Sequence, residues 1–361
     1  MMQSHAATNR KTLSPVPIAQ VTIQDEFWSP KRDTWRTVTI HDALDKFEKT
    51  GVLKNFDRIR DGRLDGHHDG PSFYDGLLYE TISGSADFLA AQRDAALESR
   101  LDGIIDHIVA AAAAAPDGYI NTWTQLLEPE HRWGANGGND HIGHDIYNAG
   151  CLVEAAVHYY RATGKSRLLQ TAVTLANTMC KVMGPTPKMN QVPGHSLPEG
   201  AFIELYHLFR EQPNLKREMP VAVNEADYLA LAEFWIEHRG VYEGRPGKDR
   251  SFGRDAQDHK PVLQQETIEG HAVRATLLFS GVVATALANG REDYLATAQR
   301  IWTNMVHRRM YITGGIGAVS TYEGFANDYV LPNDGYLETC AAVGAGFFHG
   351  AMHRAFGDAR Y

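Results

Sequence analysis

The sequence predicts an all-α protein whose helical hairpins form an α/α toroid, a six-hairpin type of barrel. Two observations predict this fold. Apolar residues recur every three or four positions at 97–113, 146–160, 168–183 and 294–310, which is the spacing of one face of an α-helix. A turn followed by a Leu or aromatic residue that opens a helix also recurs, at Phe88, Leu168, Tyr228, Tyr294 and Tyr361.

The recurrences are 80, 60, 66 and 67 residues apart, which fits two antiparallel helices with their loops in each repeat. A right-handed stack of TPR-like hairpins is the competing geometry, but its period is shorter and more regular. Strand signals are few, and the best is Val16–Ile23. A toroid of this type places its binding cleft at one end, lined by the longer loops. The long polar loops are expected at 55–72, 121–145, 190–199, 242–265 and 313–334.

Composition excludes several classes of protein. The net charge of -9 argues against nucleic-acid binding, since phosphates require a basic face. No apolar run approaches the roughly 20 residues of a membrane helix, and the first twenty residues do not resemble a signal peptide. Cys151, Cys180 and Cys340 are an odd number of well-separated cysteines, which suits a reducing compartment. We therefore expect a cytoplasmic protein without nucleic-acid or membrane partners, and a homodimer is left open.

The segment 311–340 contains the strongest candidates for catalytic and metal-binding residues. Its start is rich in glycine, which allows close approach of the backbone to a ligand. Glu323 is expected in a loop, where a desolvated carboxyl group can act as a general acid. Glu338 and Cys340 open an apolar helix and could form half of a metal site. Alternatively, a lone cysteine at a helix start is a small buried apolar residue.

The same segment resembles glycoside hydrolase family 127, the β-L-arabinofuranosidases. The family pattern MYITGGIG spans Met310–Gly317, and Leu-Pro-Asn-Asp spans Leu331–Asp334. Glu323, Asp328 and the Glu-Thr-Cys triplet also match. The resemblance implies a barrel catalytic domain at 31–361, after an extended segment at 1–30. Because 357–361 begins another repeat, we expect the chain to continue into further barrel helices and β-sandwich domains.

The resemblance also implies substrate-binding residues. His144 matches a family His-x-x-Tyr, His195 a Gly-His, and His271 the motif GHAVR. A neutral imidazole has one donor and one acceptor, which suits sugar hydroxyls. Trp123 could stack on a sugar face, and Tyr74 is a similar candidate. For the histidines the alternative is a bond to local backbone, and for the aromatic residues it is core packing.

The mechanism implied by the resemblance is retaining hydrolysis with a zinc-bound cysteine thiolate as nucleophile. Glu338 and Cys340 match two zinc ligands, and Glu323 matches the acid/base residue. The other two ligands, a Cys-Cys pair that includes the nucleophile, are expected beyond residue 361. The spacing between Asp334 and Glu338 is one residue shorter than is common in the family, and the family's first-helix Gln has no clear match near 40–47.

The expected substrate is thus a small oligosaccharide or glycoside ending in β-L-arabinofuranose or a related sugar, and the expected cofactor is Zn²⁺. Two other functions stay open. One is a metal-free sugar enzyme on the same fold, of the unsaturated uronyl hydrolase or epimerase type. The other is an inactive carbohydrate-binding fragment, because the chain lacks the nucleophile.

Overall fold

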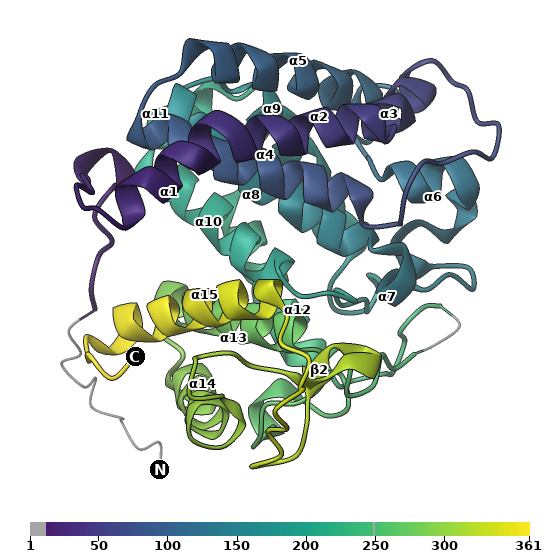
Figure 1. Ribbon diagram of the computed structural model, residues 1–361. Coiled ribbons are helices and arrows are strands. Elements are labelled where there is room, and N and C mark those ends of the chain that lie inside the picture. The colour runs from purple at the N-terminus through teal and green to yellow at the C-terminus, as the bar shows by residue number, and fades with distance from the viewer. Residues whose placement is uncertain (1–11, 248–249) are drawn as a thin grey trace.

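Helices make up most of the computed structural model, which describes residues 12–247 and 250–361. Five helices form an inner row in which each packs against the next (Figure 1). They are α4 (Tyr74–Ala91), α8 (Asp145–Thr163), α10 (Pro198–Glu211), α13 (Ala272–Asn289) and α15 (Thr339–Phe356). The expected all-α architecture is confirmed.

An outer row packs against the inner one. It contains α3 (Val52–Arg60), α5 (Ala95–Ala112), α9 (Arg167–Val182), α12 (Glu225–His238) and α14 (Glu292–Asn304). Inner and outer helices alternate along the chain, and α4/α5, α8/α9 and α13/α14 are joined by two or three residues. Connections this short require antiparallel neighbours. The inner helices therefore run in the same direction, and their first turns meet at one end.

The remaining elements are short. They are α1 (Trp28–Thr34), α2 (Ile40–Lys49), α6 (Thr122–Leu127), α7 (Asp140–Gly143), α11 (Pro213–Glu218), 3₁₀ turns at Ile18–Gln20, Pro129–Gly134, Val262–Gln264 and Ser320–Tyr322, π turns at Trp35–Thr39 and Met305–Arg309, and the antiparallel strands β1 (Ala318–Val319) and β2 (Gly324–Phe325). Two clusters of buried apolar side chains fill the space between the rows. Leu152, Phe202 and Trp235 belong to the first, and Phe279 and Phe348 to the second. Burial of each such side chain contributes about 1.5–3 kcal/mol.

In contrast to the sequence-based expectation, helix α13 is long and apolar enough to cross a membrane, with a mean hydropathy of 1.4. However, 67% of it is buried inside the protein, between α10, α14 and α15. This degree of burial is typical of a core helix.

The structure corrects some of the local predictions. The strand predicted at Val16–Ile23 is not formed, because Pro17 lacks an N–H donor and no described segment pairs with it; Ile18–Gln20 within it is a 3₁₀ turn. Phe88 does not open a helix, since the apolar positions of α4 continue through it to Leu89. Gly357, with φ +60°, ends α15, and the next residues form a turn. Residues 1–11 of the predicted 1–30 segment lie outside the described residues.

Candidate active site

The candidate site lies where the first turns of the inner helices meet. His144 directly precedes α8, His195 lies three residues before α10, and His271 is the N-cap of α13. Glu338 is the N-cap of α15, with Cys340 one residue inside the helix. Residues separated by almost two hundred positions are brought together in this way.

Glu323 reaches the same place through a short backbone pairing. The N–H of Ala272 donates to the carbonyl of Glu323 at 3.0 Å, and the N–H of Phe325 donates to that of Gly270 at 2.9 Å. Gly270 has φ +74°, and a Cβ there would lie 1.9 Å from the Arg254 carbonyl oxygen. Only glycine fits this position. The pairing fixes Glu323 beside His271.

The hydrogen bonds of His271 determine its tautomer. Its Nδ1 accepts from the N–H of Arg274, so its Nε2 carries the proton. Nε2 lies 3.0 Å from Oε2 of Glu323 and donates to it. Burial lowers the pKa of His271, which favours this neutral form. The Glu323 side chain is 47% exposed and can therefore reach a bound ligand.

His144 and His195 are neutral in the opposite tautomer. Nδ1 of His144 lies 2.7 Å from the carbonyl of Ile142, and Nδ1 of His195 lies 2.9 Å from that of Ser196. Each Nδ1 donates, so each Nε2 is left as an acceptor. Burial lowers the pKa of His144 to about 4 and that of His195 well below its usual value.

The three rings and Glu323 form one continuous group. The ring centroids of His144 and His195 are 6.2 Å apart, and those of His195 and His271 are 5.7 Å apart. With the His271–Glu323 contact, the predicted convergence of His144, His271 and Glu323 is confirmed. The group offers both donors and acceptors, as a polyhydroxylated ligand requires.

Glu338 and Cys340 complete the arrangement. One ligand atom from each of His271, Glu323 and Glu338 lies within 4.8 Å of the other two. The Oε2 atom of Glu338 is buried and has no hydrogen-bond partner among the described residues. Burial and the neighbouring Glu338 carboxylate raise the pKa of the Cys340 thiol to about 11. A buried, unpaired carboxylate oxygen beside a thiol suits a cation as its missing partner.

Comparison with known proteins places this arrangement in a family. The sequence profile of the β-L-arabinofuranosidase GH127 catalytic domain matches residues 20–361. The chain belongs to family GH127. The resemblance in the segment 311–340 is thereby confirmed.

Relatives agree with this assignment. The non-reducing end β-L-arabinofuranosidase of Bifidobacterium longum subsp. longum is 30% identical over 91% of the chain and 53% of its own length. A solved GH127 β-arabinofuranosidase has a TM-score of 0.86, with 33% identity, over 98% of this chain and 53% of that one. The structure of the GH127 β-L-arabinofuranosidase of Geobacillus stearothermophilus T6 has a TM-score of 0.82 and 31% sequence identity, over 95% of this chain and 54% of that one. The chain spans about half the length of these relatives.

Sequence reasoning missed the support behind His271 in this GH127 domain. The Arg274 guanidinium is almost fully buried and pairs with both Asp255 and His141. The backbone oxygen of Asp255 accepts the N–H of His271 at 3.0 Å. Arg274 stands in the GHAVR motif, and an arginine so close to an otherwise apolar helix start was the available signal.

Tyr147 was also missed as a member of the site. Its ring lies 4.5 Å from that of His195, and its hydroxyl donates to Glu80 at 2.7 Å. The His-x-x-Tyr pattern that identified His144 contains this tyrosine. Glu80 gave no sequence signal, because it lies inside the apolar pattern of α4.

Trp123 and Tyr74 contact residues outside the histidine group. The Trp123 indole N–H donates to Glu128 at 3.0 Å, and its ring packs against His68. The Tyr74 hydroxyl donates to Thr50, and its ring packs against Phe47. These contacts do not connect them to the histidine group, and their binding of substrate stays a prediction.

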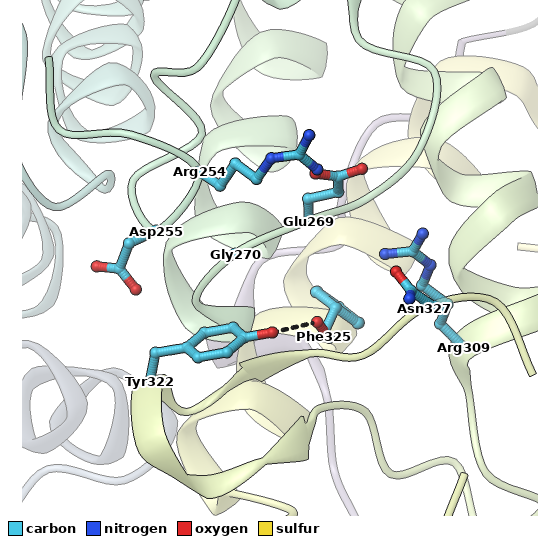
Figure 2. A pocket seen from close by; sticks show the side chains of 8 residues that line it. All are labelled: Arg254, Asp255, Glu269, Gly270, Arg309, Tyr322, Phe325 and Asn327. Atoms are coloured by element: carbon cyan, nitrogen blue, oxygen red, sulfur yellow. Dashed lines mark hydrogen bonds and ion pairs between the residues drawn. The ribbon is translucent and has the colours of Figure 1, made fainter. Parts of the chain in front are cut away.

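A pocket of about 360 Å³ lies beside the segment that carries Glu323 (Figure 2). The Tyr322 hydroxyl donates to the carbonyl of Phe325 at 2.9 Å at its edge. Its lining residues are Arg254, Asp255, Glu269, Gly270, Arg309, Tyr322, Phe325 and Asn327. The pocket therefore shares Asp255 and Gly270 with the support of His271 and borders the candidate site.

Two glycines at the start of the segment 311–340 allow it to pack closely against a neighbouring part of the same segment. A Cβ at Gly315 would lie 2.9 Å from the Leu337 side chain, and one at Gly317 would lie 2.8 Å from the Tyr336 carbonyl oxygen. The N–H of Ala318 donates to that same oxygen at 3.0 Å. The close approach that the glycines permit is to the segment leading into Glu338. The approach of this backbone to a ligand, which the glycines also allow, stays a prediction.

Proposed function

We propose that the chain is the catalytic-barrel part of a retaining glycoside hydrolase that releases terminal β-L-arabinofuranose or a related sugar. The observation that carries the proposal is the convergence of His271, Glu323 and Glu338 within 4.8 Å at the helix starts of a GH127 domain. The names of the relatives support the substrate class.

Glu323 is the proposed acid/base residue. Its half-exposed carboxyl group can protonate the leaving oxygen and later take a proton from water. The Nε2–H of His271 holds the carboxyl group in place from the protein side. The free Nε2 atoms of His144 and His195 accept hydrogen bonds from sugar hydroxyls and orient the ring.

Zinc is the proposed cofactor, and Glu338 and Cys340 are its proposed ligands from this chain. The unpaired Oε2 of Glu338 and the adjacent thiol fit such an ion. When bound, zinc lowers the pKa of a ligating thiol so that a thiolate exists at neutral pH. We place the other two ligands, a Cys-Cys pair that includes the nucleophile, beyond residue 361, because the sequence has no cysteine after Cys340.

A reducing, cytoplasmic location is part of the proposal. All three cysteines are free, and a catalytic thiolate requires that its cysteine is not oxidised. A homodimer is compatible with the proposed reaction, which needs no residue from a second copy.

Two substitutions in the full-length protein test the proposal. We expect Glu323→Gln to retain zinc and to lose at least about 100-fold in the cleavage of an aryl β-L-arabinofuranoside, because proton transfer contributes 10²–10⁴-fold. We expect Cys340→Ser to lose both zinc and turnover. Cys180→Ser is the matched control and retains both. Full turnover by Glu323→Gln, or by Cys340→Ser after chelation, would favour a metal-free sugar enzyme.

A further inference from the structure

A second group of potential ligands lies deeper in the barrel. Glu154 and His158 are one turn apart on α8, and Glu204 is on the neighbouring helix α10. One ligand atom from each lies within 4.8 Å of the other two. Glu154 and His158 follow Tyr147 by seven and eleven residues on α8, so the rise of the helix separates them from Tyr147 in the candidate active site by about 10 Å and about 16 Å.

His158 is held in the orientation of a metal ligand. Its Nδ1 lies 2.8 Å from Oδ1 of Asp87, on α4, and donates to it. Its Nε2 therefore points to the carboxylates and lies 3.3 Å from Oε2 of Glu204. A carboxylate that fixes one imidazole nitrogen while the other faces a cation is the usual support of histidine ligands in proteins.

Among the described residues, Glu204 has one close partner, and Glu154 has none at hydrogen-bonding distance. Oε2 of Glu204 is inaccessible to solvent and lies 3.3 Å from Nε2 of His158, without hydrogen-bond geometry. Burial opposes ionisation of Glu204, but the pairing with His158 lowers its pKa. Within residues 12–247 and 250–361, the Glu154 carboxylate has neither a hydrogen bond nor an ion pair. Because a buried carboxylate without a partner is costly, burial and the nearby Glu204 raise the pKa of the Glu154 carboxyl group to about 8.

Other positive side chains do not satisfy this group. Arg161 and Arg354 act on Glu204 electrostatically, but neither comes within 4.0 Å of it, and Arg161 pairs with Glu211 instead. Glu80 adds a further carboxylate that acts on Glu154. The side chains of His158 and Glu204 are 21% and 39% exposed, so solvent reaches this group even though the Oε2 atom of Glu204 itself is covered.

We propose that Glu154, His158 and Glu204 bind one divalent transition-metal cation, at a site separate from Glu338 and Cys340. Two carboxylates and one imidazole form a mixed oxygen and nitrogen donor set, which suits Mn²⁺ or Zn²⁺. The ion joins α8 to α10 and, through Asp87, to α4. It acts as a structural tie within the inner row of helices.

Mn²⁺ is the discriminating probe, since a site with a thiol ligand favours zinc. The experiment titrates metal-free, full-length protein with MnCl₂ and follows free Mn²⁺ by electron paramagnetic resonance. We expect about one Mn²⁺ per chain in the wild type and in Cys340→Ser. We expect less than one tenth of that in Glu204→Gln and in His158→Gln. Glu211→Gln, which removes an exposed carboxylate from the same helix, is the control and binds as the wild type does.

Circular dichroism of each variant separates loss of the site from loss of the fold. If the variants do not fold, crystals of the wild type grown with MnCl₂ give the answer. An anomalous peak between Glu154, His158 and Glu204 supports the site. Three results overturn the site. They are binding of Mn²⁺ by Glu204→Gln and His158→Gln at the wild-type level, no binding by the wild type, and a crystal without that peak. In that case, the imidazolium of His158 is the cation of this group.

Discussion

His271 has two separable tasks, and two substitutions distinguish them. Its Nδ1 caps α13, and its Nε2–H holds Glu323. His271→Ala removes both interactions. His271→Asn keeps a side-chain oxygen that can cap the helix, but the shorter amide does not reach the carboxylate 3.0 Å beyond Nε2.

The expected magnitudes follow from these contacts. Loss of a cap costs about 1 kcal/mol, so we expect His271→Ala to lower Tm by about 2 °C and His271→Asn to leave it almost unchanged. A hydrogen bond to a charged group contributes about 1.5–3 kcal/mol. Because the Glu323 side chain is 47% exposed, we expect the lower value, which is a roughly tenfold loss of kcat/KM in both variants.

The assay combines thermal unfolding with cleavage of an aryl β-L-arabinofuranoside by the full-length protein. The informative result is a variant that is stable but slow. If His271→Asn had the kcat/KM and the pH profile of the wild type, the role of Nε2–H in holding Glu323 would be refuted. If it were as unstable as His271→Ala, the account of the cap would be wrong.

Two further predictions concern stability. Burial lowers the pKa of His144 in the folded protein to about 4, below the usual value of about 6.5. Between these two pH values the unfolded chain binds a proton at His144 and the folded chain does not. The free energy of unfolding therefore falls as the pH falls from about 6.5 to about 4, by up to about 1.4 kcal/mol per pH unit. His144→Gln should flatten this part of the plot of unfolding free energy against pH, and an unchanged slope would contradict it. Gly270→Ala should lower Tm by several degrees and reduce turnover, because its Cβ would collide with the Arg254 carbonyl oxygen. Gly290→Ala, at φ +77° with nothing within 4 Å, should show only the smaller backbone cost, and equal losses would refute the collision.

The sequence predicted the helices well because their apolar periodicity is long and regular, as in α8 and α9. It failed where local chemistry competes with packing. Pro17 disfavours a strand that the apolar pattern suggested, and Phe88 continues α4 because the apolar positions of that helix run on to the buried Leu89. Such outcomes depend on contacts between distant segments, which a pattern within one segment does not contain.

The candidate site could be predicted only in part. His144, His195, His271 and Glu323 were found through motifs, and the structure brings them together. Arg274, Tyr147 and Glu80 were missed, because their importance lies in side-chain contacts across three different helices. The contacts of His271 with both Glu323 and Arg274 fix its tautomer, which no sequence motif reveals.

The parallel inner helices have an electrostatic consequence. The N-terminus of each α-helix carries about half a positive charge together with unsatisfied N–H groups. The first turns of α8, α10, α13 and α15 all point toward the group of His144, His195, His271 and Glu338. The backbone itself therefore attracts anions to this end of the barrel, before any metal is bound. This field disfavours imidazolium, and in the proposed reaction it would stabilise the negative charge that develops on the departing sugar oxygen.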